Sequence, residues 1–373
     1  MKHKRIIRIF FLFFALSFGF GWLGQAYAAG NDTVIAQSEA LRLDELERAA
    51  GQYAPSMDMT QGISLNQGLS ELIDTGTREL GGVLRPAIRS GVLILIIVIL
   101  TGVAQGAAEK GSHVFQAAPM AGALAITAVA AADVHSLIGL GREAIEAMAT
   151  FSNVLLPTMA AAVAASGAPA GGLARQAATV LFSNLLIHLI SGILIPLVYA
   201  YIAASAVHAA IGNPGIQRIA KAIKGVVTGI LTTVLLAYVG YLTVSGVIAG
   251  TTDAMTVKTA KLAMSSMVPV VGGVLSDAAE SVLAGAGILK NAVGVFGVLA
   301  ILGVCLLPFL QMGIHYLVYK ISAALSATLG DNTTVGLIDS IGSAFALTLG
   351  MTASCALLLL VSVISGISAA GVG

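Results

Sequence analysis

Long apolar runs with few charges are the feature that most constrains this chain. A helix of about 20 apolar residues crosses the ~30 Å hydrocarbon core of a bilayer. Only 10% of the 373 residues are charged, against about 25% in soluble domains. We therefore predict an all-α polytopic membrane helix bundle, with spans at 90–108, 114–132, 177–209, 225–250, 291–318 and 341–369.

The number of spans is six or seven. A seventh run, 149–168, is rich in alanine and contains Pro157, which is expected to break a helix. The positive-inside rule does not separate the two arrangements, because Lys and Arg divide five against five between the two sides in both cases. The densest basic segment, QRIAKAIKG at 217–225, favours a cytoplasmic loop there and hence six spans.

The N-terminus, residues 1–28, has the pattern of a signal peptide. An apolar segment at 9–23 precedes small residues at Ala26 and Ala28. The basic residues before it are Lys2, Lys4, Arg5 and Arg8. An uncleaved first membrane helix is the alternative, and in both cases the residues from 29 onward are exported.

Residues 29–85 are the only polar region, and nine of the eighteen acidic residues lie between Asp32 and Glu79. Leu43, Leu46 and Ala50 share one face of a predicted amphipathic helix. A second such helix is predicted through Leu65, Leu69, Leu72 and Ile73. We expect an extracytoplasmic helical segment that docks on its own membrane domain, 86–373, or on a partner.

The sequence carries no recognisable motif for catalysis, a metal or a nucleotide cofactor. Cys305 and Cys355 lie inside apolar runs and are expected to be buried rather than bridged. No acid or cysteine keeps metal-ligand spacing with His113, His135 or His208. The net charge of +1 gives no sign of nucleic-acid binding. We expect a non-enzymatic protein without a cofactor or metal.

Two polar stripes lie within predicted spans. The first comprises Asn184, His188 and Ser191, and the second comprises Gln311, His315 and Tyr319. Each set recurs at helical spacing and so shares one helix face. Polar groups avoid acyl chains, so the stripes either line a conduit or hydrogen-bond neighbouring helices.

The segment 251–290 interrupts the apolar pattern. Residues 251–267 are expected to form an interfacial helix, which Pro269 ends. Gly272 and Gly273 then permit unusual backbone angles, and Asp277 with Glu280 resembles a capping box that starts a new helix. The apolar piece around Pro269 is either a re-entrant loop or an interfacial hinge.

Two long runs, HSLIGLGREAIEAMATFSNVLLPTMAAAVAASG at 135–167 and KTAKLAMSSMVPVVGGVLSDAAESVLAGAGILKNAVGVFG at 258–297, resemble the stage III sporulation protein AE family. So do the segments LPF and YKISAALSATLGD that follow. The resemblance implies a multi-pass protein of the mother-cell membrane around the forespore. It implies membership of the channel, or feeding tube, that joins mother cell and forespore and supports forespore development after engulfment.

The same resemblance implies partners among the other stage III channel proteins, including ring-forming intermembrane components and a cytoplasmic ATPase. The family supplies no catalytic residues. We therefore expect a non-enzymatic channel subunit, and the alternative is a self-sufficient transporter or pore for small solutes.

Overall fold

The computed structural model describes residues 43–50, 65–109, 111–165, 169–267, 272–328 and 331–368. Of residues 169–177, 242–267, 272–289, 365, 366 and 368 it describes the backbone alone. The predicted signal peptide lies outside the described residues. The described part of the chain is almost entirely helical and contains no strand, which confirms the all-α prediction.

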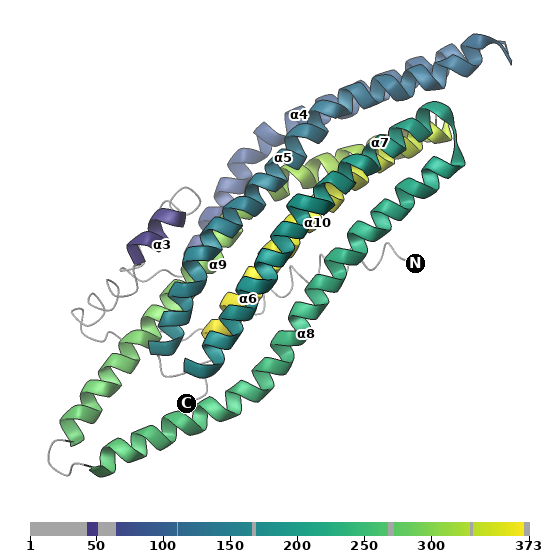
Figure 1. Ribbon diagram of the computed structural model, residues 1–373. Coiled ribbons are helices and arrows are strands. Elements are labelled where there is room, and N and C mark those ends of the chain that lie inside the picture. Colours follow the sequence, from purple (N-terminus) through teal and green to yellow (C-terminus); the bar gives the residue numbers. More distant parts are fainter. Residues whose placement is uncertain are drawn as a thin grey trace.

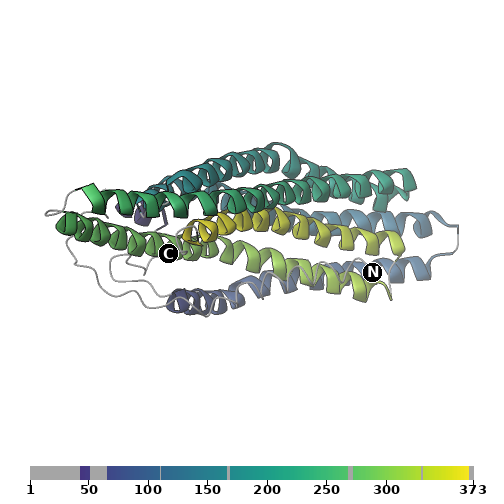
Figure 2. The same cartoon turned by 90° about the horizontal axis from the view of Figure 1, so that it is seen from below.

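Long helices run alternately up and down in an elongated bundle (Figures 1 and 2). Six helices among the described residues are long and apolar enough to cross a membrane. Their elements are α4 (Leu65–Ala107), α5 (His113–Ala165), α6 (Pro169–Leu189) continued by η2 (Ile190–Leu194) and α7 (Ile195–Ile211), α8 (Pro214–Met267), α9 (Gly272–Ser326) and α10 (Asn332–Ser368).

The predicted seventh span is part of α5 and not a helix of its own. Pro157 lies inside α5, which continues to Ala165. In a packed membrane bundle, neighbouring helices and local adjustments can compensate for the hydrogen bond that a proline removes. The structure therefore favours six spans over seven.

The helices are much longer than a bilayer is thick. At 1.5 Å per residue, the 55 residues of α9 extend about 80 Å, against ~30 Å of hydrocarbon. The expected boundary at residue 85 falls inside α4, and the basic segment 217–225 falls inside α8 rather than in a loop. No proline interrupts α8 between 215 and 267. Residues 251–267 therefore extend that helix, which corrects the prediction of a separate interfacial helix.

Short turns with specific caps reverse the chain between helices. Gly212 ends α7 with a φ of 76°, which glycine adopts without a Cβ clash, and its N–H donates to the His208 carbonyl at 2.7 Å. The Asn213 side chain accepts the Gly215 N–H at 2.8 Å, and Pro214 begins α8. At the α9–α10 turn, the Asp331 carboxylate accepts the Thr333 N–H at 3.1 Å.

The π-helix η2 joins α6 to α7 without a break. The Ile195 N–H donates to the Ile190 carbonyl, five residues back. Pro196 follows directly, and a proline ring collides with the carbonyl four residues before it in a regular α-helix. The wider π turn accommodates Pro196 while the helix continues.

α10 is the central helix of the bundle. It packs against α5, α6, α7, α8 and α9, and it carries none of the exposed large apolar side chains. Two glycines let neighbours approach closely: a Cβ at Gly141 of α5 would lie 2.5 Å from Thr348, and one at Gly294 of α9 would lie 2.4 Å from Ile367. Most outward-facing apolar side chains belong to α4, the start of α5, α6–α8 and the end of α9.

The short helix α3 (Leu43–Ala50) confirms the predicted amphipathic helix. Its buried residues are Leu43, Leu46 and Ala50, the three that share one face. They join the main hydrophobic core, and α3 packs on α5. The polar segment therefore docks, at least through α3, on the helical bundle of the same chain.

Candidate functional site: a polar layer inside the bundle and a charged strip outside it

The predicted stripe on α9 faces the interior of the bundle. His315 is buried, and its Nδ1 lies 2.8 Å from the Gln311 carbonyl one turn earlier on the same helix. Its ring lies edge-on to Phe345 of α10, with centroids 6.1 Å apart. Gln311 itself is half-buried. These contacts place the stripe in packing between helices.

Tyr319, the last residue of that stripe, bonds across the bundle to an acid that the sequence analysis missed. Its hydroxyl donates to Asp133 Oδ2 of α5 at 2.8 Å, and the tyrosine is fully buried. Its ring also meets Phe345 edge-on, with centroids 5.1 Å apart. The sequence signal that could have found Asp133 is a lone aspartate at the end of an apolar run, because an acid within a membrane span is expected to pair with another polar group.

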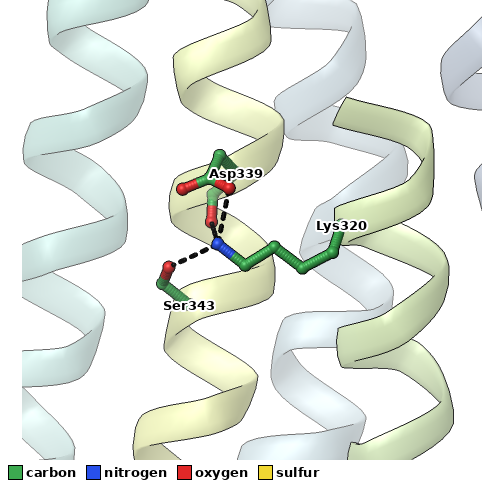
Figure 3. A network of polar contacts seen from close by, with 3 residues as sticks. All are labelled: Lys320, Asp339 and Ser343. Carbon is green, nitrogen blue, oxygen red and sulfur yellow. Dashed lines mark hydrogen bonds and ion pairs between the residues drawn. The ribbon is translucent and has the colours of Figure 1, made fainter. Parts of the chain in front are cut away.

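Lys320, the next residue of α9, binds α10 (Figure 3). Its Nζ donates to Asp339 Oδ1 at 2.5 Å and to Ser343 Oγ at 3.2 Å, and it lies 5.8 Å from the centre of the Tyr316 ring. Beside this pair, an open depression lies at the α9–α10 turn. It is lined by Lys320, Ala323, Ala324, Ala327, Asn332, Val335, Gly336 and Asp339.

A second buried network joins α6, α8 and α10. Thr179 Oγ1 lies 3.0 Å from the Tyr238 hydroxyl and 2.9 Å from Ser362 Oγ. All three residues are buried. Sequence reasoning missed them because each is a single polar residue in a different span and forms no stripe of its own.

Lys290, the last residue of the segment 251–290, is a buried residue of α9. It is 4% exposed, and its Nζ donates to the Ile367 carbonyl at 2.8 Å. The last four carbonyls of a helix lack partners within that helix. Lys290 therefore caps the end of α10 with a charge of the favourable sign.

The predicted stripe on α6 faces outward. Asn184 and His188 are exposed, and Ser191 is half-buried within η2. Leu181 and Leu185 are exposed on the same helix. The structure therefore does not bring the two predicted stripes together, since one lies outside the bundle and the other inside.

The outer face of α5 carries a polar strip that no sequence pattern had singled out. This α5 polar strip comprises the exposed residues His135, Ser136, Arg142, Glu143, Glu146, Thr150 and Asn153. Arg142 Nε donates to Glu146 Oε1 at 2.8 Å, and both side chains are more than half exposed. The strip was detectable as polar residues at helical spacing, but a run rich in alanine and glycine concealed it.

The structure describes only some of the residues of the predicted cap and hinge. Pro269 lies outside the described residues, so the re-entrant loop and the hinge both remain predictions. α9 begins at Gly272, followed by Gly273. Asp277 and Glu280 lie within α9 and not at its start, which corrects the predicted capping box. No proline stands between residues 272 and 277 to prevent a helix from forming before Asp277.

The remaining reactive groups are isolated. Cys305 and Cys355 are free and buried, and the Cys305 thiol lies 3.6 Å from Met148 Sδ. Among the described residues, no cluster of three His, Cys, Asp or Glu side chains could hold a metal ion. Within this part of the chain, the polar contacts between helices join α5 to α9, α9 to α10, and α6 to α8 and α10.

Comparison with known proteins identifies relatives. The family model for stage III sporulation protein AE matches residues 52–370. The protein named Stage III sporulation protein AE from Bacillus subtilis (strain 168) is 28% identical over 207 residues, which are 56% of this chain and 52% of that relative. The alignment thus spans about half of the relative's length. No solved structure matches the chain.

Proposed function

The chain belongs to the stage III sporulation protein AE family, and on this premise we propose that it is a non-enzymatic membrane subunit of the channel complex linking mother cell and forespore. Its place is the mother-cell membrane that surrounds the forespore, and its role supports forespore development after engulfment. Its partners are the other stage III channel proteins, among them ring-forming intermembrane components and a cytoplasmic ATPase.

One observation carries the subunit role: charged side chains inside the bundle bond to side chains of neighbouring helices, whereas other charged side chains are exposed on part of its exterior. Inside, Tyr319 pairs with Asp133 and Lys320 pairs with Asp339. Outside, Arg142, Glu143 and Glu146 are exposed on α5. Insertion scales assign about 2.5–3.5 kcal/mol to each Arg, Lys or Asp at the centre of a bilayer. An exterior of this kind suits a chain that works inside an assembly.

The docked helix α3 also fits a subunit anchored in one membrane. Leu46 and Ala50 are fully buried, so the start of the described chain is fastened to the membrane helices. α5, on which α3 packs, is also the helix with the α5 polar strip. The docked helix α3 thus offers a structured surface for partners in the intermembrane space.

A self-sufficient small-solute transporter is the second candidate. The outward pair Asn184 and His188 favours it, because such groups need a polar neighbour if they lie within the hydrocarbon. His315, in contrast, is buried against its own helix and Phe345. One stripe lies outside the bundle and the other inside it. This separation weighs against a conduit formed by a single chain.

Isolation of the full-length chain from sporulating cells tests the proposal. A tagged copy is extracted in mild detergent at the stage of engulfment, and co-purifying proteins are identified by mass spectrometry. We expect other stage III sporulation proteins to co-purify. A tagged unrelated six-span protein from the same membrane is the control. Isolation of the chain alone, after cross-linking in the cells, would contradict a subunit role.

Solute flux separates the two candidates. The purified chain is reconstituted alone into liposomes loaded with a small fluorescent solute. We expect these liposomes to remain tight. Flux that His188→Leu or Gln311→Leu abolishes would instead establish the transporter, and flux unaffected by both substitutions would assign the leak to reconstitution.

A further inference from the structure

The α5 polar strip lies at the same height in the bundle as the apolar outer face of α6 and α7. A Cβ at Gly141 would touch Thr348, and Met159 and Ile367 both lie against Gly294. Residues 141–159 of α5 therefore run beside residues 348–367 of α10. On the other side, Thr179 of α6 bonds Ser362, and Tyr201 of α7 lies beside Ser343. Residues 180–200 thus share this height.

The exterior differs sharply between these helices at this height. On α6 and η2, Leu181, Leu185 and Ile193 are 71%, 50% and 47% exposed. On α5, no large apolar side chain beyond Leu124 is exposed, and the outer face consists of the α5 polar strip. One side of the bundle is therefore suited to acyl chains and the other is not.

The bilayer must reach this height, because the apolar segments of α6–α7, α9 and α10 pass through it. Their most apolar 18-residue windows have mean hydropathies of 2.2, 2.6 and 2.2. A lipid-facing strip with an arginine and two glutamates would leave charges in hydrocarbon, which membrane proteins avoid by pairing or by facing a wet interior. Another protein surface must therefore cover the α5 polar strip.

We propose that this surface is the same strip on a second copy of the chain. The strip carries both charge signs, so two copies related by a two-fold axis complement each other. Arg142 of one copy can meet Glu143 of the partner, whose carboxylate has no ion pair within the described chain. Gly139, which lies between His135 and Arg142 on this face, has no atom within 4 Å of an added Cβ, so two α5 helices can approach closely.

Polar and charged groups at such an interface hold water as well as each other. Thr150 and Asn153 extend the strip towards the end of α5 without adding charge. The contact is thus a hydrated, mixed-charge interface. With this interface, a homo-oligomer forms the membrane part of the complex. This inference rests on the proposed function and extends it.

Cysteine cross-linking in proteoliposomes tests the interface. The background is the full-length chain with Cys305→Ala and Cys355→Ala, both at buried positions. Thr150→Cys places a thiol on the strip, and Leu185→Cys places one at similar height on the outer face of α6. Each is treated with a short bifunctional thiol reagent and, separately, with a membrane-impermeant monofunctional reagent.

We expect Thr150→Cys to form covalent dimers and Leu185→Cys to form none. Adding Glu143→Arg should lower the dimer yield several-fold, since like charges would then face each other. Glu79→Arg, an exposed reversal on α4, should leave the yield unchanged. This pair of variants shows whether the strip itself holds the copies together.

Three results would overturn the proposal. Dimers through Leu185→Cys but not Thr150→Cys would place the interface on α6. Labelling of Thr150→Cys without dimers would show that the strip faces bulk water, and no reaction at all would show that lipid or the chain itself covers it. In each case, continued co-purification of sporulation proteins would leave the proposed function standing.

Discussion

Removing one hydroxyl tests the polar layer inside the bundle. Tyr319→Phe deletes the group that donates to Asp133 at 2.8 Å and keeps the ring that packs edge-on against Phe345. The tyrosine is fully buried, so water cannot replace the lost bond without entering the core. The substitution therefore isolates the hydrogen bond between α5 and α9.

The expected change in the free energy of unfolding follows from the two groups that this hydrogen bond joins, a neutral hydroxyl and a carboxylate. Hydrogen bonds to charged groups are worth about 1.5–3 kcal/mol in proteins, whereas side-chain hydrogen bonds in membrane bundles average about 0.6 and reach about 1.7 kcal/mol. Asp133 is half-buried and keeps part of its hydration. We expect Tyr319→Phe to lower the free energy of unfolding by about 1–2 kcal/mol, a 5- to 30-fold change in the unfolding equilibrium.

A double-mutant cycle with Asp133→Asn provides the measurement, using reversible unfolding in mixed micelles. The coupling energy between positions 133 and 319 should be near 1 kcal/mol, above the additivity error of about 0.3–0.5 kcal/mol. Tyr316→Phe is the matched control: this half-buried tyrosine lies one turn earlier, and its ring but not its hydroxyl meets Lys320. Purely additive effects at 133 and 319 would refute the reasoning.

Three further outcomes are expected. Leu46→Asp places a charge in the buried face of α3 and should make a cysteine at Ala50 reactive towards a water-soluble thiol reagent; continued protection would show that α3 docks by other contacts. Gly141→Leu forces side-chain atoms against α10, where even a Cβ would lie 2.5 Å from a neighbour, and should cost about 1–3 kcal/mol in the unfolding assay. Gly106→Leu, in open space, should cost nothing measurable. Lys290→Met keeps the apolar stem but removes the cap on α10, so amide exchange should accelerate in the last turn of that helix; unchanged exchange would show the cap to be dispensable.

Patterns local in the sequence led to correct predictions. Long apolar runs predicted the helical bundle, and Leu43, Leu46 and Ala50 predicted the buried face of α3. Helix ends were harder to predict. α5 passes through Pro157, because packing against neighbours outweighs a local signal of this size, and α9 begins before Asp277.

Partners distant in the sequence could not be predicted in the same way. Tyr319 and Asp133 are 186 residues apart, and Thr179 and Ser362 are 183 apart. Each is a single polar residue in an apolar run, and the sequence is compatible with many different pairings of such residues. The two polar stripes had equivalent spacing, yet one faces outward and the other inward.

The sequence by itself determined the solvent of this protein, since its apolar content and the length of its runs leave a lipid bilayer as the medium for its helices. It also determined the family, through residues matched along most of the chain. Only the tertiary structure decided which face of each helix is covered. Spacing places side chains on a common face, but the direction of that face depends on how six helices rotate and pack against one another.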